Sequence, residues 1–228
     1  DDKKNLLING KNVKLRGANR HLVNPLKGFV PEPAVDDTDV DLFKEANMNF
    51  VRTSHYPPGI GFVDQCDEKG LYVNRESAVL DCGKANKASA GMQDDPQYLH
   101  LFVDQQREVL RNYGSHPSVI MWSMCNESVF GPNFAATADF VRETDPSRAL
   151  TASYQVKDDP DHKSYDIKSW HYPNWDQNYE KTGMPYMYDE WMHVLGHHAE
   201  LWIHDANSRD YWGRSLDKAW TSLFSSNG

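Results

Sequence analysis

The sequence predicts an α/β fold with a parallel sheet, and three observations support this prediction. Segments with the pattern of strands alternate along the chain with segments of helical pattern, which is typical of parallel βαβ units. The run over residues 119–127 is apolar almost to its end, as expected of a short strand buried on both faces of such a sheet. The length of 228 residues is sufficient for one domain with a sizeable core and suits an α/β barrel near the small end of that fold's range.

The first half of the chain predicts a hairpin, three strands and three helices. A turn at Asn9 and Gly10 predicts the hairpin, which leads into the first strand. We expect the first helix to begin with Asp36 or Asp37 as its N-cap. The expected strands cover residues 13–19, 49–55 and 71–76, and the later two helices cover residues 60–69, closed by Gly70, and 96–113, ended by Gly114.

The second half of the chain continues the alternation of strands and helices. The run over residues 119–127 is followed by a helix at about 134–143, by strands over 150–154, 166–172 and 185–191, and by a last helical pattern at about 205–224. Seven candidate strands result, whereas a closed (β/α)8 barrel needs eight. We therefore expect a barrel that is incomplete at its C-terminal end.

Two of these strands end in a carboxylate. Glu127 closes the apolar run at 119–127, and Glu190 lies near the end of the apolar and aromatic run at 184–191. A lone carboxylate at the mouth of a buried strand is costly unless it is paired or used. Two such carboxylates on different strands are what a retaining glycosidase requires, one as general acid and base and one as nucleophile.

Four segments carry a resemblance to a known family. They are residues 15–21 (Leu-Arg-Gly-Ala-Asn-Arg-His), 51–57 (Val-Arg-Thr-Ser-His-Tyr-Pro), 116–127 (His-Pro-Ser-Val-Ile-Met-Trp-Ser, then Asn-Glu) and 188–191 (Tyr-Asp-Glu-Trp). In this order they resemble the catalytic barrel of glycoside hydrolase family 2, the β-galactosidase and β-glucuronidase family, from about residue 6 to residue 212. The resemblance implies a TIM-type (β/α)8 barrel formed by residues 1–228 as a single catalytic domain, without the family's flanking β-sandwich domains.

The resemblance also implies roles for the residues at the strand ends. Glu127 would be the acid and base, and Glu190 the nucleophile of a retaining β-glycosidase. Asn126 would bind the 2-hydroxyl of the sugar, and Arg52 would hold the nucleophile carboxylate in its ionised form. The alternatives are a structural ion pair for Glu127 and a strand-end cap for Asn126. Asp189 is expected to point to the other side of its strand, because side chains alternate, and to be structural.

Further aromatic and imidazole side chains match family positions that line the sugar site. His21, His55 and His193 are expected to contact the substrate, although an isolated histidine is more often structural. Tyr172 resembles an active-site tyrosine that donates to the nucleophile region, with a packing role as the alternative. Trp191 is either a sugar platform or part of the barrel wall. The histidine pattern favours β-galactosides as substrates.

The sequence predicts neither a metal ion nor another cofactor. After Glu76, the positions that offer magnesium ligands in the best-known β-galactosidases are Leu80 and Cys82, and neither suits a hard cation. The neighbouring His197 and His198 would suit zinc, but the expected chemistry uses carboxylates.

The amino-acid composition limits the classes of partner that the chain is expected to bind. A formal net charge of −9 without a basic cluster argues against binding to nucleic acid or to an anionic membrane surface. Three cysteines without metal-type spacing argue against a disulfide framework. A signal peptide and an apolar stretch of membrane length are absent from the printed sequence, which leaves the localisation unknown. An incomplete barrel exposes sheet edges, so self-association is expected.

Two other functions compete with the glycosidase prediction. The chain could be a non-catalytic carbohydrate-binding remnant of such an enzyme, because the eighth strand is missing from the pattern. It could also be an esterase, because Ser54 and Ser123 lie near strand ends. The esterase alternative lacks the Gly-x-Ser-x-Gly elbow that such enzymes use.

Overall fold

The fold is a nearly closed barrel of seven parallel strands with helices between them, as predicted. The computed structural model describes residues 5–24, 26–83, 91–153, 164–171, 184–190 and 221. The strands are hydrogen-bonded in sequence order, and they are β3 (Gly17–Arg20), β4 (Phe50–Thr53), β5 (Tyr72–Glu76), β6 (Val119–Ser123), β7 (Ala149–Ala152), β8 (Ile167–His171) and β9 (Tyr186–Glu190).

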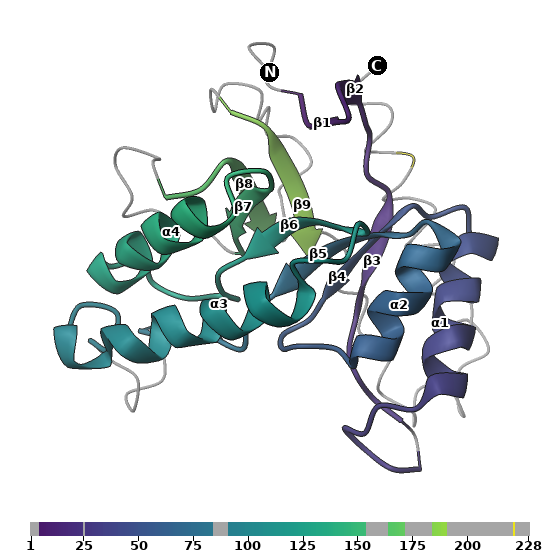
Figure 1. Ribbon diagram of the computed structural model, residues 1–228, viewed down its shortest axis with the longest axis horizontal. Helices are drawn as coiled ribbons and strands as arrows, with labels where there is room; N and C mark the ends of the chain where they lie inside the picture. Colours follow the sequence, from purple (N-terminus) through teal and green to yellow (C-terminus); the bar gives the residue numbers. More distant parts are fainter. Residues whose placement is uncertain are drawn as a thin grey trace.

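The first and last of these strands approach each other. The side-chain amide of Asn19, on β3, donates a hydrogen bond of 2.8 Å to the main-chain oxygen of Asp189, on β9. Figure 1 shows the strands curving toward one another, with α1 (Pro33–Glu45) and α2 (Ile60–Lys69) covering one side and α3 (Leu99–Tyr113) and α4 (Pro132–Thr144) the other. The carboxyl ends of all seven strands therefore gather at one end of the barrel.

The residue at which α1 begins differs from the sequence prediction. The helix begins at Pro33 after the extended residue Glu32, three residues before the expected cap at Asp36. Proline is favoured at the first helical position because its fixed φ suits the helix. The backbone N–H that proline lacks would have no intrahelical acceptor at this position, so nothing is lost. Asp36 instead lies in the first turn, where its carboxylate forms a buried ion pair of 2.6 Å with Arg20.

The other helices begin and end close to the expected positions. Gly70 ends α2 with a φ of +70°, a left-handed conformation that glycine adopts without steric cost. A short 3-10 turn, η2 (Pro96–Tyr98), precedes α3, and Gly114 follows it. The predicted N-terminal hairpin is present as β1 (Leu7–Ile8) and β2 (Lys11–Asn12), which pair in antiparallel fashion. The expected helix at 205–224 lies outside the described residues, apart from Thr221.

The main hydrophobic core lies between the helices and the outer face of the barrel. Val51, Phe62, Val73, Trp122 and Val141 belong to it, and each is at most 1% exposed. Residues that alternate with these strand residues point into the barrel. Apolar Phe50 and Met121 come before polar Arg52 and Ser123 on their strands, so the polar side chains lie nearer the carboxyl ends. Among the described helices, none has the length and apolar character needed to cross a membrane.

Candidate active site

Arg52 is the central cation at the carboxyl end of the barrel. Its side chain, on β4, is 1% exposed, so the guanidinium must be paired. Nε lies 2.8 Å from Glu76 Oε2, and Nη1 lies 2.9 Å from Glu190 Oε1. Nη2 donates to Asn126 Oδ1 at 2.6 Å. Burial lowers the pKa of Arg52, but the charges of Glu76, Asp189 and Glu190 outweigh this effect and raise the pKa above its usual value.

Glu76 forms the floor of the site. The residue is fully buried, and it connects β5 to two neighbouring strands. Ser123 Oγ, on β6, donates to Glu76 Oε2 at 2.9 Å, and His55 Nδ1 lies 2.9 Å from Glu76 Oε1. With Arg52 bound to both of its carboxylate oxygens, Glu76 fixes the guanidinium in a single orientation.

Glu127 lies beyond the end of β6 rather than at its last residue. The strand ends at Ser123, and Glu127 follows in a segment fixed by its neighbours: Asn126 N–H donates to the Val79 oxygen, and Glu127 N–H donates to the Ser153 oxygen. The φ of Glu127 is +43°, a left-handed value that is uncommon for a residue with a side chain. The surrounding hydrogen bonds hold this conformation.

The two glutamates predicted as catalytic lie close together. One oxygen of Glu127, one oxygen of Glu190 and one ring nitrogen of His171 lie within 4.8 Å of one another. The glutamate side chains are 22% and 14% exposed, so both are partly accessible from solvent. A retaining glycosidase requires its two carboxyl groups about 5 to 5.5 Å apart.

His171 has a position that the sequence did not reveal. Its Nδ1 lies 3.2 Å from Glu127 Oε1, and its Nε2 lies 2.7 Å from Ser153 Oγ. Nε2 also lies 3.3 Å from Asp189 Oδ1. The usable signal in the sequence is a histidine at the end of a buried strand, next to the predicted site residue Tyr172.

The direction of the Asp189 side chain differs from the sequence prediction. This side chain was expected to point away from the site, but Arg52 Nε lies 3.7 Å from Asp189 Oδ2 while Arg52 Nη1 contacts Glu190. The reason is a shift in the β8–β9 register at Trp170 and His171, which interrupts the regular alternation of side chains. Burial raises the pKa of Asp189, but hydrogen bonds and the nearby cation Arg52 outweigh burial and lower it.

Ser153, His171 and Asp189 do not form a nucleophilic triad. Such a triad places the serine and the aspartate on different nitrogens of the imidazole. Here both Ser153 Oγ and Asp189 Oδ1 contact Nε2, and Ser153 itself donates to the other oxygen of Asp189. Ser153 is 1% exposed, and Ser123, one of the serines considered for an esterase, is fully buried against Glu76.

The structure brings together six of the nine predicted site residues. Arg52, Asn126, Glu190 and His55 are linked by direct contacts, and Glu127 is linked to Glu190 through His171. The ring of His21 lies 5.1 Å from that of His55, edge to face. Partial burial and the charges of His55 and Arg52 lower the pKa of His21. Tyr172, Trp191 and His193 lie outside the described residues.

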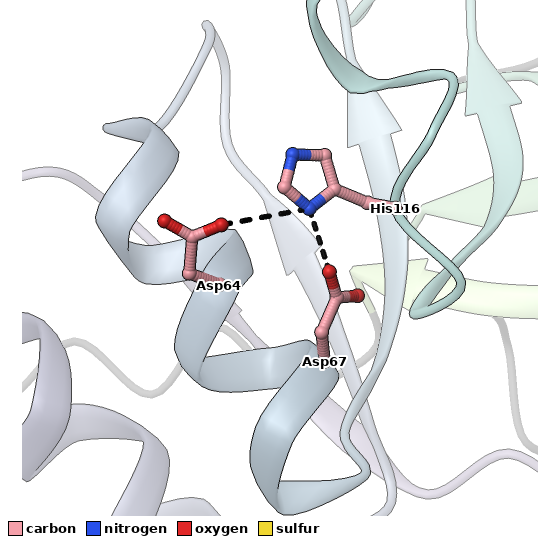
Figure 2. A group of neighbouring side chains, drawn as sticks. All are labelled: Asp64, Asp67 and His116. Carbon is pink, nitrogen blue, oxygen red and sulfur yellow. Dashed lines mark hydrogen bonds and ion pairs between the residues drawn. The ribbon is translucent and has the colours of Figure 1, made fainter.

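A second cluster of acidic and imidazole side chains lies at the other end of β6, and Figure 2 shows it. Asp67, on α2, accepts hydrogen bonds from the main-chain N–H of Ser118 and, at 2.6 Å, from Nδ1 of His116. Asp64 lies farther away, with Oδ1 3.8 Å from that nitrogen. Through these contacts with Ser118 and His116, Asp67 anchors the start of β6 on α2.

Leu80 and Cys82, at the positions that the resemblance relates to magnesium ligands, have no oxygen atom in their side chains. Leu80 forms a bridge with Asn126 and is 47% exposed, and burial raises the pKa of the Cys82 thiol. Hard cations such as magnesium prefer carboxylate, carbonyl and water oxygens. The absence of a catalytic metal stays a prediction.

The fold and this site define a class of protein: a barrel with paired carboxylates at the carboxyl ends of its strands, the arrangement used by barrel glycosidases. The chain belongs to glycoside hydrolase family 2, because residues 2–201 match the model described as "Glycosyl hydrolases family 2, TIM barrel domain".

Individual relatives agree with this assignment. A β-galactosidase of Lactococcus lactis subsp. lactis (strain IL1403) is 34% identical over 201 residues, which cover 88% of this chain and 20% of that protein. A β-galactosidase of Vibrio vulnificus (strain YJ016) is 37% identical over 151 residues, which cover 64% of this chain and 14% of that protein. The chain thus spans a fifth or less of the length of these relatives.

The structural neighbours carry a different name. A β-glucuronidase from Dictyoglomus thermophilum is similar with a TM-score of 0.66 and 25% identity, over 74% of this chain and 31% of that chain. A β-glucuronidase from an uncultured Clostridium sp. has a TM-score of 0.77 and 21% identity, over 97% of this chain and 43% of that chain. The second likeness bears on the fold alone and agrees with an incomplete TIM barrel.

Proposed function

We propose that this barrel is the catalytic domain of a retaining β-glycosidase that cleaves β-galactosides, with Glu127 as acid and base and Glu190 as nucleophile. The observation that carries the proposal is the short separation of their carboxylate oxygens, within 4.8 Å. This short separation of the nearest oxygens favours a double displacement, whose carboxyl groups lie about 5 to 5.5 Å apart, over inversion, whose carboxyl groups lie about 6.5 to 9.5 Å apart.

The neighbours of Glu190 support its role as nucleophile. A nucleophilic carboxylate must stay ionised and must be aimed at the anomeric carbon. Arg52 Nη1 donates to Glu190 Oε1 at 2.9 Å, which favours the charged form of the carboxylate. Asn126 Oδ1 is held by the same guanidinium, and we expect the amide group of Asn126 to bind the 2-hydroxyl of the sugar.

The preference for galactosides is supported by the relatives of this chain. The sequence relatives named above are β-galactosidases at 34% and 37% identity, whereas the β-glucuronidases named above are at most 25% identical. A glucuronide also carries a carboxylate that needs a cationic partner. Among the described residues, the buried cation Arg52 lies beside the proposed catalytic pair, and it is already bound to Glu76 and Glu190.

The test is the turnover of aryl β-galactoside, β-glucuronide, β-mannoside and β-glucoside by this chain and by Glu190→Gln. We expect cleavage of the galactoside and a loss of about a thousandfold or more in the variant, because the amide cannot form the glycosyl-enzyme. Glu68→Gln, at an exposed position on α2, is the matched control and should keep full activity. Cleavage of another sugar would replace the galactoside preference.

Two outcomes would replace the proposal. Sugar binding without turnover, by folded protein, would support the carbohydrate-binding alternative. Labelling of a serine by a fluorophosphonate would support the esterase alternative.

A further inference from the structure

His171 lies between the proposed catalytic pair and a buried aspartate. Its Nδ1 lies 3.2 Å from Glu127 Oε1 and 3.7 Å from Glu190 Oε2. Its Nε2 lies 2.7 Å from Ser153 Oγ and 3.3 Å from Asp189 Oδ1. The side chain of His171 has no solvent exposure, so neighbouring groups must satisfy both ring nitrogens.

The contacts of Ser153 assign a proton to Nε2. A serine hydroxyl has one proton, and Ser153 donates it to Asp189 Oδ2. Ser153 Oγ can therefore only accept at its 2.7 Å contact with His171 Nε2. Nε2 must be the donor, whatever the charge of the ring.

The contact between His171 and Glu127 then requires a second proton. A neutral ring protonated on Nε2 has a lone pair on Nδ1, and an ionised Glu127 offers only lone pairs. Two acceptors would repel each other at 3.2 Å. Either Nδ1 carries a proton and donates it to the carboxylate, or the carboxyl group carries it and donates to Nδ1.

From this count we propose that His171 and Glu127 share one proton across the Nδ1···Oε1 contact, and that His171 is a positioning residue that keeps this proton available to the acid. The proposal rests on the proposed function. In the first step Glu127 gives the shared proton to the glycosidic oxygen, the bond from the anomeric carbon to that oxygen breaks, and Glu190 bonds to the anomeric carbon. In the second step water replaces Glu190 and returns a proton to the pair.

The described charges around His171 favour a protonated pair. Glu127 faces it from the segment after β6, Asp189 and Glu190 from β9, and Arg52 from β4. Burial lowers the pKa of His171, but the hydrogen bond and charge of Asp189 and the charge of Glu190 outweigh both burial and Arg52. The pKa is therefore raised above its ordinary value, which extends the pH range in which the pair holds a proton.

A leaving-group comparison tests the role of His171. In His171→Gln, we expect kcat/KM for phenyl β-galactoside to fall about tenfold or more, because departure of phenoxide needs a proton. For 2,4-dinitrophenyl β-galactoside, whose leaving group departs without one, kcat/KM should stay within about threefold of the parent. In the pH profile of kcat/KM for phenyl β-galactoside, the alkaline limb should also move to lower pH in this variant. The reason is that an imidazolium loses its proton at about pH 6.5, whereas a carboxyl group alone loses its proton at about pH 4.3.

The control is His116→Gln, which removes another largely buried imidazole at the opposite end of β6. This variant should leave the ratio between the two substrates and the alkaline limb unchanged. Equal losses for both substrates in His171→Gln, without a shift of the limb, would mean that His171 only supports the fold and would overturn the proposal.

Nitrogen-15 NMR of the histidine rings tests the shared proton without turnover. The His171 signals are assigned by their loss in His171→Gln. We expect Nε2 to stay protonated throughout, and the titration midpoint of Nδ1 to fall by about half a pH unit or more in Glu127→Gln, because the neighbouring negative charge is removed. An unchanged midpoint would overturn the proposal, even in an active enzyme. If the midpoint shifts but the chain cleaves no glycoside, the shared proton is upheld and the proposed function is contradicted.

Discussion

Arg52 shows why buried charge at this site is both necessary and costly. It carries one guanidinium into a region where Glu76, Asp189 and Glu190 would otherwise repel one another. Glu76 is fully buried, so its charge depends on this pairing. Removing one partner of such a pair is worse than removing both, because the remaining charge has neither water nor an opposite charge to stabilise it.

We therefore predict a strong coupling between Arg52 and Glu76. Arg52→Met should lower the free energy of unfolding by about 3 to 5 kcal/mol. The double variant Arg52→Met/Glu76→Gln should be more stable than Arg52→Met alone, because the uncompensated carboxylate is gone. Urea unfolding of the parent, both single variants and the double variant measures this coupling. Additive losses would contradict it.

Arg75 is a buried cation of a different kind. It lies on the outer face of β5, with its guanidinium 4.4 Å from the centre of the Tyr113 ring. Its three side-chain nitrogens have no hydrogen-bond partner of good geometry among the described residues. Burial lowers the pKa of Arg75 to about 10, which expresses the cost of its charge in this place.

An apolar side chain of similar length should replace Arg75 without loss. We predict that Arg75→Met leaves the free energy of unfolding unchanged or raises it by up to about 2 kcal/mol. Arg75→Ala should lower it by about 2 to 4 kcal/mol, because it leaves a cavity beside Tyr113. Thermal and urea unfolding of both variants provide the measurement. Equal destabilisation by the two substitutions would show that the charge itself stabilises the fold.

At the scale of elements, local patterns predicted the fold well. The alternation of strands and helices and the glycine that ends α2 depend on short-range backbone preferences, and these were visible in the sequence. The start of α1 was missed although Pro33 carried the signal, because the acidic residues that follow looked like caps. Motifs around Glu127, Glu190 and Arg52 were sufficient to assign these residues to one site.

The parts of the site that could not be predicted depend on contacts between strands. The side chain of Asp189 points into the barrel because of the register shift between β8 and β9. Alternation within one strand predicts that this side chain points away from the site. The place of His171 beside Glu127 depends on a contact across 44 residues of sequence. Neither has a local signature, because register is fixed by packing and pairing of the whole sheet.

The turn between α4 and β7 predicts how the stability of the fold depends on pH. Asp145 accepts hydrogen bonds from Trp122 Nε1, Arg148 Nη1 and Ser147 N–H, and so fastens the end of α4 to β6. Burial raises the pKa of Asp145, but the hydrogen bonds outweigh it and lower the pKa to about 2, from an ordinary value of 3.8.

A carboxyl group whose pKa is lower in the folded state stabilises the fold above its unfolded pKa and loses this contribution as the pH falls through the folded pKa. Asp145→Asn should therefore be less stable than the parent at neutral pH, and the difference should shrink from about pH 4 down to about pH 2. Urea midpoints across this range measure it, with the exposed Asp104→Asn as control. A difference that is constant with pH would contradict the prediction.

At the scale of the whole molecule, barrel closure raises the question of self-association. Asn19 links the first strand to the last through a single side-chain hydrogen bond, and the described ranges contain no backbone pairing between β3 and β9. We propose that the edges of these strands contribute to homo-oligomers, because unpaired edges favour pairing with another chain. Light scattering at increasing concentration should detect the oligomers, and a monomer at high concentration would contradict the proposal.

The central claim, that Glu190 attacks the sugar, is tested most directly by trapping the covalent intermediate. A 2-deoxy-2-fluoro galactosyl fluoride should react with the protein, because its good leaving group allows the first step while the fluorine slows the second. The account predicts that mass spectrometry of the digested protein finds one fluorosugar on the peptide containing Glu190 and none in Glu190→Gln. A label on another carboxylate, or turnover of aryl galactosides by Glu190→Gln at the rate of the parent, would contradict it.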